Sequence, residues 1–545
     1  MLNINSHQRV AVYFFYDLYG KADGYVYTFL NGLKEIADRV VVVINGSLEE
    51  ASEAKMREIT DEIIIRENTG YDVYAYKAAF EYIGWEELQK YEEVVYCNST
   101  VFGPIYPFKE MFDKMSEQEE LDFWGITSHP VLMTADTLNP LGYIPEHIQH
   151  YFVVYRKKFT ASEDLKLYWD TLPPITSYDE TVGLHETVFT RHFSDLGYKW
   201  DTYVKYDPEQ EGTQYVLMYD PLKAAEKFRS PVIKRKLFFL ENIFVTSNSI
   251  GEKVTALLGF LEKNALYDTD LIYENIIRCC NQKDFIDNFG FWYVLPENYV
   301  VPSSEEHEAL SQAAVIMIVT DGNDDLREKL MLKLPEGIKT SVLYADGGDQ
   351  SSIRHMMDEI REISGQYKYI CIWNDRKMPE AMYNIVQSSK REVEECSLLA
   401  TPEYIQNVID LFHRNKWLGV LMPHRPETGG DAQGIPSAWG AVYNAVNKLK
   451  NEVGLHVPVS RDAYPVSQYG YFWFRSDALL KLLSVQFDYS EWKGTDYQAY
   501  TCLVPYLIQN SGFAPGYVTS DSLAAHQFAV LTYYMKTNRH DYANK

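Results

Sequence analysis

Four short apolar runs separated by helical patterns fill the first hundred residues, and this alternation limits the fold more than any other feature. The runs cover residues 9–17, 40–44, 63–66 and 93–97. Continuous apolar runs of this length are typical of strands buried on both faces, and strands joined by helices form parallel sheets with right-handed crossovers. The sequence therefore predicts an open, mostly parallel α/β sheet.

The strand predicted over residues 93–97 stops abruptly at the polar residues Asn98, Ser99 and Thr100. In open α/β sheets, ligands bind beyond the carboxyl ends of the strands, where loops converge and helix N-termini present amide hydrogens. We therefore predict a site for a polar, phosphorylated ligand beside these three residues.

The pattern of the first part returns after residue 313 in the same order. The predicted strand 369–373 ends in polar residues, as the strand 93–97 does. Three more pairs of segments are similar. Residues 417–425 resemble 123–130, residues 471–475 resemble 151–156, and residues 507–518 resemble 193–204. Repeated segments in one order indicate internal duplication. The sequence predicts an α/β domain over 1–207, a helical middle region over 208–313 and a second α/β domain over 314–545.

Composition narrows the classes of partner. A formal net charge of −26 argues against nucleic acid, because nucleic-acid binding depends on Lys and Arg. The six cysteines lack zinc-site spacing and favour a reducing compartment. We predict a cytoplasmic protein with neither a signal peptide nor a membrane-spanning helix.

One basic run, KFRSPVIKRK from Lys227 to Lys236, stands out in this acidic chain. One interpretation is peripheral contact with anionic lipid on the inner face of a membrane, or with a phosphate. The other is an ordinary solvated surface. The sequence leaves both open.

The two predicted α/β domains differ at one acidic position. Glu186 lies eleven residues before Gly197, and Thr501 lies eleven residues before Gly512. A hydroxyl side chain cannot act as a base near neutral pH, whereas a carboxylate can. We therefore place the chemistry in the first domain and predict that the second domain is degenerate or binds glycan.

Six segments of the chain are long enough to be compared with known families: YEEVVYCNSTVFGP, LDFWGIT, IQHYFVVYRKK, RSPVIKRKLFF, YDTDLIYENIIR and FWFRSDAL. Together they resemble the rhamnan synthesis protein F family of bacterial sugar transferases. The resemblance implies two GT-A-like nucleotide-sugar folds and a glycosyltransferase of cell-wall polysaccharide synthesis. It also implies dTDP-L-rhamnose as the donor and a polyprenyl-linked glycan as the acceptor.

The segment HETVFTRHFSDLGY is similar to the Glu-Asp helix of inverting sugar transferases with the GT-A fold. This resemblance makes Glu186 the general base that deprotonates an acceptor hydroxyl, and it places Arg191 beside the acceptor. Trp124 is predicted to stack on an acceptor sugar, with a position in the core as its alternative. For Glu186, the alternative is the ordinary preference of a carboxylate for a helix N-terminus.

The predicted donor-binding residues lie at strand ends and in turns. They are Tyr16, Asp17, Arg66, Asn68, Asp72, Lys77, Asn98, Ser99 and Thr100. The resembling family has Asn-Asp-Ser where this chain has Asn98–Thr100, so no clear Asp-x-Asp is present and the need for Mg²⁺ or Mn²⁺ stays open. Arg66 or Lys77 is then expected to neutralise the diphosphate, although a helix cap for Asp72 and surface ion pairs for the two cations are alternatives.

Two other functions stay open at this point. The chain can be a catalytically inactive glycan-binding or scaffold protein of polysaccharide assembly, which the absence of an acid at Ser99 favours. It can also be a transferase that uses a different nucleotide sugar, because the residues that contact the base are not identified by sequence.

Overall fold

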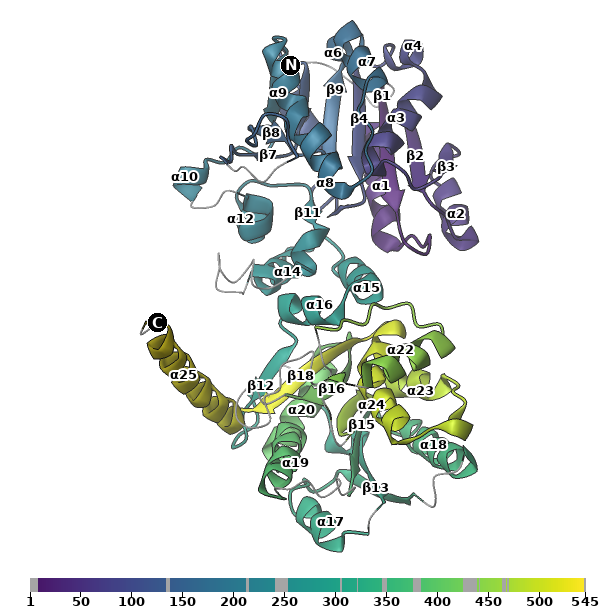
Figure 1. Ribbon diagram of the computed structural model, residues 1–545, viewed down its shortest axis with the longest axis vertical. Helices are drawn as coiled ribbons and strands as arrows, with labels where there is room; N and C mark the ends of the chain where they lie inside the picture. The colour runs from purple at the N-terminus through teal and green to yellow at the C-terminus, as the bar shows by residue number, and fades with distance from the viewer. Residues whose placement is uncertain are drawn as a thin grey trace. The chain divides into compact units, whose positions relative to one another are not determined.

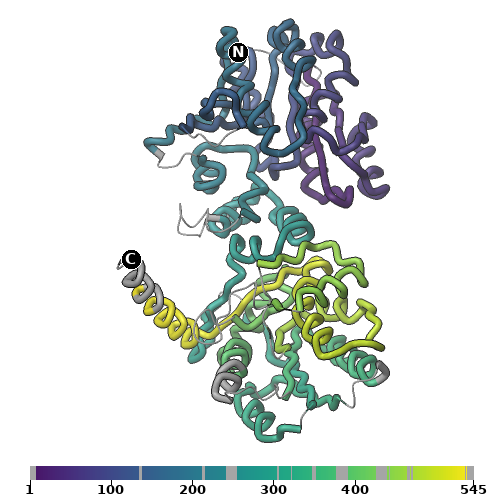
Figure 2. The backbone as a smooth tube through the Cα atoms, in the orientation of Figure 1, coloured from purple at the N-terminus to yellow at the C-terminus, as the bar shows by residue number. Residues whose placement is uncertain are grey.

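A computed structural model shows two compact units, residues 1–275 and 276–545 (Figures 1 and 2). The structure describes residues 8–133, 138–211, 215–240, 253–303, 306–320, 322–345, 350–375, 384–424, 439–440, 442–462, 467 and 470–543. Each unit has an α/β fold built on a mixed sheet with mostly parallel strands, which confirms the predicted fold class.

The first unit is built on a seven-stranded sheet in the order β10-β6-β9-β4-β1-β2-β3. The strands are β1 (Arg9–Tyr16), β2 (Arg39–Asn45), β3 (Ile63–Arg66), β4 (Glu93–Asn98), β6 (Phe123–Gly125), β9 (Phe152–Arg156) and β10 (Trp200–Thr202). Strand β9 runs antiparallel to both of its neighbours, and the other pairs are parallel. Two ribbons pair β5 (Val101–Phe102) with β11 (Ile233–Lys234) and β7 (Ser128–His129) with β8 (His147–Ile148).

Helices cover both faces of this sheet, as Figure 1 shows. The helices of this unit are α1 (Gly24–Ile36), α2 (Glu50–Arg57), α3 (Tyr71–Ile83), α4 (Trp85–Leu88), α5 (Phe108–Met115), α6 (Lys157–Thr160), α7 (Glu163–Asp170), α8 (Tyr178–Thr181), η2 (Val182–Glu186), α9 (Thr187–Asp195), α10 (Pro208–Glu211), α11 (Val216–Tyr219), α12 (Pro221–Glu226), η3 (Arg235–Phe238) and α14 (Lys253–Lys263), and α15 (Asp270–Cys279) crosses the boundary at residue 275. Apolar side chains of α3, α7 and α9 pack on one face in a single buried cluster. Burial of such clusters is the main stabilising contribution to a unit of this size.

The second unit also contains a seven-stranded sheet, in the order β12-β18-β16-β17-β15-β13-β14. Its strands are β12 (Trp292–Leu295), β13 (Ala313–Val319), β14 (Lys339–Tyr344), β15 (Tyr369–Asn374), β16 (Leu418–Pro423), β17 (Phe472–Arg475) and β18 (Ala514–Ser520). Its helices are α16 (Gln282–Phe289), η4 (Leu310–Gln312), α17 (Asp324–Met331), α18 (Gln350–Ser364), α19 (Asn384–Leu398), α20 (Pro402–Arg414), α22 (Val442–Glu452), α23 (Ser476–Ser484), η5 (Tyr489–Glu491), α24 (Gly494–Asn510) and α25 (Asp521–Ala543).

Six strands correspond between the two sheets, which bears out the predicted duplication. The order β10-β6-β9-β4-β1-β2 matches β18-β16-β17-β15-β13-β14, and β9 and β17 are the antiparallel strands in both. The sheets differ at one edge each, where β3 extends the first and β12 extends the second. All four repeated segments of the sequence include corresponding strands.

Two glycines end corresponding helices in the same way. Gly197 and Gly512 both have φ of +92°, a conformation that favours glycine. The N–H of Gly197 donates to the Ser194 carbonyl at 3.0 Å, and that of Gly512 donates to the Gln509 carbonyl at 2.9 Å. This supports the eleven-residue register that compares Glu186 with Thr501.

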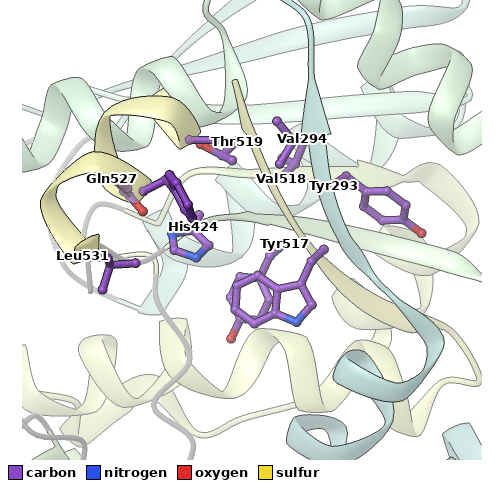
Figure 3. A pocket seen from close by; sticks show the side chains of 11 residues that line it. Tyr293, Val294, His424, Tyr517, Val518, Thr519, Gln527 and Leu531 are labelled. Carbon is purple, nitrogen blue, oxygen red and sulfur yellow. The ribbon is translucent and has the colours of Figure 1, made fainter. Parts of the chain in front are cut away.

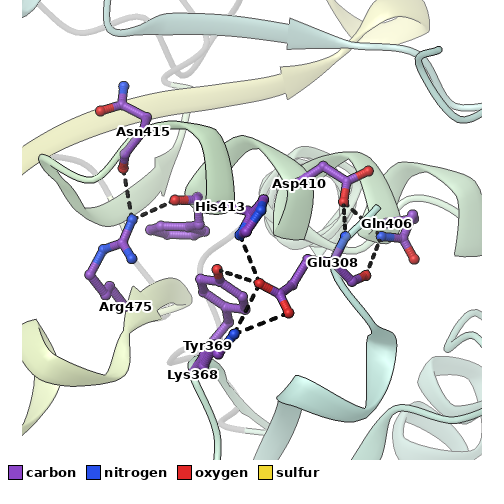
Figure 4. A network of polar contacts seen from close by, with 9 residues as sticks. Glu308, Lys368, Tyr369, Gln406, Asp410, His413, Asn415 and Arg475 are labelled. Carbon is purple, nitrogen blue, oxygen red and sulfur yellow. Dashed lines mark hydrogen bonds and ion pairs between the residues drawn. The ribbon is translucent and has the colours of Figure 1, made fainter. Parts of the chain in front are cut away.

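Two arginines at the ends of the antiparallel strands make corresponding contacts. Arg156 donates to the carbonyl of Met115, the last residue of α5, at 2.7 Å and to that of Gln118, just beyond the helix, at 2.6 Å. In the second unit, Arg475 donates to the Asn415 carbonyl at 2.7 Å, beyond α20 (Figure 4). A cation at a helix C-terminus is favoured by the helix dipole. Each arginine thus fixes a helix to the sheet.

The predicted middle region is divided between the two units at residue 275. Strand β11, which lies inside the basic run, pairs with β5 and so belongs to the first unit. No helix among the described residues is both long enough and apolar enough to cross a membrane.

Candidate functional site

A cavity of about 590 Å³ opens in the first unit beyond the carboxyl end of β4. Its wall contains Asp72 from the first turn of α3, Asn98 and Thr100 from the end of β4, Glu186 from η2 and Lys234 from β11. The rest of the wall includes several aromatic side chains, namely His129, His147, His150, Tyr151, Tyr178, Tyr215 and Tyr219. The cavity therefore combines two carboxylates, three cationic side chains and flat ring surfaces.

Glu186 ends a π-helical turn that joins α8 to α9. Such turns occur frequently at functional sites. The backbone N–H of His150 donates to Glu186 Oε1 at 3.4 Å. Burial raises the pKa of Glu186, while Lys234, the His150 N–H and His129 lower it. A carboxylate with a raised pKa is a stronger base, as proton abstraction requires.

Asp72 is held by the end of the neighbouring strand. The Asn98 side-chain amide donates to Asp72 Oδ2 at 3.1 Å, and Thr100 Oγ1 donates to Asn98 Oδ1 at 2.6 Å. Burial and the charge of Glu186 raise the pKa of Asp72 to about 6, and the Asn98 hydrogen bond opposes this rise. Two carboxylates in one cavity favour a cation between them.

Lys234 supplies that cation. Its backbone is fixed because β11 pairs with β5, which places Lys234 opposite Val101. Its Nζ lies 3.8 Å from the centre of the Tyr151 ring, in a cation–π contact. Burial lowers the pKa of Lys234 to about 8, and Glu186 and Asp72 act against this shift. The ammonium is therefore charged at neutral pH.

Three histidines of the wall have lowered pKa values. His129 and His147 stack with ring centres 5.3 Å apart, and burial lowers the pKa of both. His150 is 3% exposed, and burial lowers its pKa well below the usual value. Among the described residues, neither ring nitrogen of His150 has a hydrogen-bond partner.

The structure brings together Glu186, Asp72, Asn98 and Thr100, four of the predicted site residues. The predicted residues that do not line this cavity are Tyr16, Asp17, Arg66, Asn68, Lys77, Ser99, Trp124 and Arg191. The donor site predicted from the first strand and the turn after β3 therefore does not coincide with the cavity.

The two cations expected to neutralise a diphosphate have other partners. Arg66 donates to Asn45 Oδ1 at 2.7 Å and to the Thr69 carbonyl at 3.0 Å. Asn45 in turn donates to Asn68 Oδ1 at 3.2 Å. Lys77 Nζ lies 3.5 Å from the Asp170 carbonyl. These contacts stabilise a turn and a helix end.

Three further predicted donor residues also lie outside the cavity. Asp17 Oδ1 accepts the N–H groups of Tyr19 and Lys21, which closes the turn after β1, and Tyr16 is 41% exposed at the end of that strand. Ser99 is buried, and its carbonyl accepts a hydrogen bond of 3.0 Å from Arg235.

The predicted acceptor residues lie outside the cavity. Trp124 has no exposed surface and packs on Phe112 with ring centres 4.9 Å apart, so it occupies the core and cannot stack on a ligand. Arg191 Nε lies 2.9 Å from the carboxylate of Asp195, one turn further along α9. The alternative interpretation of Trp124 as a core residue is thus correct.

Sequence reasoning missed Lys234 and the histidines as site residues. Lys234 lies in the basic run that was interpreted as a lipid-binding or solvated surface. His150 and Tyr151 lie in IQHYFVVYRKK, a segment used only to recognise the family resemblance. Among the described residues, no three His, Cys, Asp or Glu side chains are grouped closely enough to hold a metal ion.

The corresponding place in the second unit has different chemistry. Asp375, the counterpart of Ser99, is fully buried. It accepts hydrogen bonds from the Thr320 N–H at 2.6 Å, the Thr320 hydroxyl at 3.0 Å and the Asn323 N–H at 2.8 Å. Thr501, the counterpart of Glu186, donates to the Tyr497 carbonyl at 3.1 Å within its own helix. The Asp375 carboxylate therefore fixes a loop.

Residues 40–336 and 319–499 match the model of the family described as rhamnan synthesis protein F. Together these matches cover most of the chain. No curated protein gives a significant match.

Solved structures give weak matches. A putative nucleotide-diphospho-sugar transferase from Desulfovibrio desulfuricans G20 is 11% identical with a TM-score of 0.24, covering 48% of this chain and 96% of that chain. A cytidylyltransferase from Leptospira borgpetersenii serovar Hardjo-bovis is 14% identical with a TM-score of 0.23 and the same coverage. TM-scores this low carry no functional conclusion.

Proposed function

Because the chain belongs to the rhamnan synthesis protein F family, we propose that it is a glycosyltransferase of polysaccharide synthesis. It moves a sugar from a nucleotide-sugar donor to an acceptor hydroxyl. Family membership supports a glycosyltransferase-like function, and our proposal adds a donor, an acceptor and a mechanism.

The observation that carries the mechanism is the position of Glu186 in a cavity shared with Asp72 and Lys234. The Glu186 carboxylate takes the proton of an acceptor hydroxyl, and the oxygen attacks the anomeric carbon of the donor. The attack comes from the face opposite the diphosphate, the bond from that carbon to the diphosphate oxygen breaks, and the configuration therefore inverts. Burial makes Glu186 a stronger base than an exposed glutamate.

The diphosphate is placed against the wall that carries Lys234 and Lys236. A leaving nucleoside diphosphate develops negative charge, and a fixed cation stabilises it. Lys234 replaces Arg66 and Lys77, which have other partners. The neighbouring Arg235 is bonded to the Ser99 carbonyl and to Asn275.

The donor we propose is dTDP-L-rhamnose, and the acceptor is a polyprenyl-linked glycan reached from the cytoplasm. Contact of the basic run with a membrane stays a prediction. Of this run, Arg229 forms an ion pair with Glu110, with 2.6 Å between Nε and Oε1, and Lys234 lines the cavity. Only part of the run is therefore available to lipid.

The test is sugar transfer from a panel of nucleotide sugars, with and without EDTA. Glu186→Gln should lower turnover by roughly 10²–10⁴-fold while dTDP still binds, because the amide cannot take a proton. Asp195→Asn, on the exposed side of the same helix segment, is the matched control. Turnover close to the unmodified protein in Glu186→Gln would exclude Glu186 as the base.

A second candidate is a glycan-binding or scaffold protein without catalysis. The absence of an acid at Ser99 and of a grouped metal-ligand set among the described residues favours it. Donor hydrolysis and a thermal shift with dTDP separate the two candidates. A thermal shift with glycan alone, and no hydrolysis of any donor, would favour the scaffold.

A further inference from the structure

A second, smaller cavity of about 230 Å³ lies wholly in the second unit, between β12, β18 and α25 (Figure 3). The residues that line it are Trp292, Tyr293, Val294, His424, Tyr517, Val518, Thr519, Ala524, Gln527, Phe528 and Leu531, and none of these carries a full charge. Without Lys or Arg on this wall, a phosphate has nothing to neutralise it.

One side of the cavity is an aromatic platform. The rings of Trp292 and Tyr517 stack with centres 4.4 Å apart at an angle of 21°. Trp292 Nε1 donates to Asp287 Oδ1 at 2.7 Å, which fixes the indole, and the residue is still 41% exposed. A fixed, exposed aromatic surface suits a ligand with a flat apolar face.

Polar side chains also line the cavity, among them His424, whose ring centre lies 5.1 Å from that of Trp292. Thr519 is 6% exposed, and its Oγ1 has no hydrogen-bond partner within the described part of the chain. Burial lowers the pKa of His424, and a side-chain hydrogen bond with Gln527 acts against this shift. An unpaired buried hydroxyl is uncommon in proteins, and a ligand with hydroxyl groups would satisfy that of Thr519.

These features together select a ligand class. A sugar ring offers a C–H face for the aromatic platform and hydroxyls for the neutral polar atoms. The volume is below the roughly 300–1,000 Å³ of sites for drug-sized ligands, so one ring fits better than a nucleotide. We propose that this cavity binds one uncharged pyranose ring of a glycan chain.

The position in the fold agrees with this assignment. His424 follows β16 and Thr519 lies near the end of β18, so the cavity is at the carboxyl ends of the strands. The counterpart of β16 is β6, and His129 beyond β6 lines the larger cavity of the first unit. The proposal rests on Trp292 and Thr519 and needs no catalysis at Glu186.

The test uses methyl α-L-rhamnoside and a short rhamnose oligosaccharide with the full chain, observed by saturation-transfer NMR and by titration. Trp292→Ala should weaken binding by roughly tenfold or more, because the stacking surface is lost. Thr519→Val should weaken it several-fold without lowering the melting temperature, because the hydroxyl has no protein partner. Tyr344→Ala, an exposed aromatic on β14, is the matched control.

Glu186→Gln should bind these probes as the unmodified chain does, which separates this proposal from the proposed catalysis. The absence of saturation transfer to both probes would overturn the proposal. Binding by Trp292→Ala as tight as that of the unmodified chain would also overturn it. Competition by dTDP at this cavity would also overturn it. If light scattering shows a dimer that Trp292→Ala dissociates, the platform is an interface between two copies instead.

Discussion

Asn98 and Asp72 are joined by a hydrogen bond of 3.1 Å that connects the end of β4 to the first turn of α3. The bond favours the charged carboxylate, but burial and Glu186 dominate and leave the pKa of Asp72 at about 6. Asp72 therefore gives up its proton in the folded chain at a higher pH than in the unfolded chain.

This difference makes the stability of the first unit depend on pH. With a folded pKa of about 6 against 3.8, the Asp72 contribution is favourable below pH 4 and is lost as the pH rises through 6. Asp72→Asn should therefore stabilise the unit by about 3 kcal/mol at pH 7.5 but only by about 1 kcal/mol at pH 4.5. Urea unfolding at the two pH values measures this. An equal effect at both values, or the same effect in Asp195→Asn, would contradict the raised pKa.

Lys234 should determine the alkaline limit of activity. Its pKa of about 8 means that it is charged below pH 8 and loses its charge above this value. Transfer should therefore fall above about pH 8, and Lys234→Met should lower kcat/KM by about 10²-fold or more through loss of a fixed cation. Lys227→Met, at the exposed start of the same basic run, is the control. An alkaline limit unchanged in Lys234→Arg would contradict the assignment, because arginine stays charged.

Asp375 should affect stability and not transfer. In the unmodified chain, the Asp375 carboxylate accepts hydrogen bonds from N–H donors. Asp375→Asn replaces this carboxylate with an amide, which should lower the free energy of unfolding of the second unit by about 1–3 kcal/mol. Transfer by the first unit should stay near its unmodified rate at a temperature where the variant is folded. Asp477→Asn, which is exposed at the start of α23, is the control. A loss of turnover in folded Asp375→Asn would mean that the second sheet takes part in catalysis.

The strands and the duplication were predictable because burial on both faces leaves a continuous apolar run, as in β1, β2 and β4. The antiparallel direction of β9 was not predictable, because its five residues are as apolar as those of a parallel strand apart from the terminal Arg156. Direction depends on which strands become neighbours, and a single strand carries little information about this.

Part of the candidate site was predictable for a similar reason. Asp72, Asn98 and Glu186 lie beside strand ends and helix starts that periodicity locates. Lys234 was missed because its place depends on the pairing of β11 with β5, which are more than a hundred residues apart in the chain. The predicted contact of Trp124 with a sugar does not agree with its buried position, because the sequence does not indicate which face of the sheet an aromatic residue in a strand occupies.

The short ribbon of β5 and β11 determines where the chain can be divided. A fragment ending at residue 207 would lack Lys234, and the cavity would be open on that side. The segment around β11, which forms this side of the cavity, is anchored by Asn275. The Asn275 side chain accepts a hydrogen bond of 3.0 Å from Arg235 and donates one of 2.6 Å to Asp23. The smallest piece that keeps the whole pocket and this anchor therefore extends at least to Asn275, where the first unit ends.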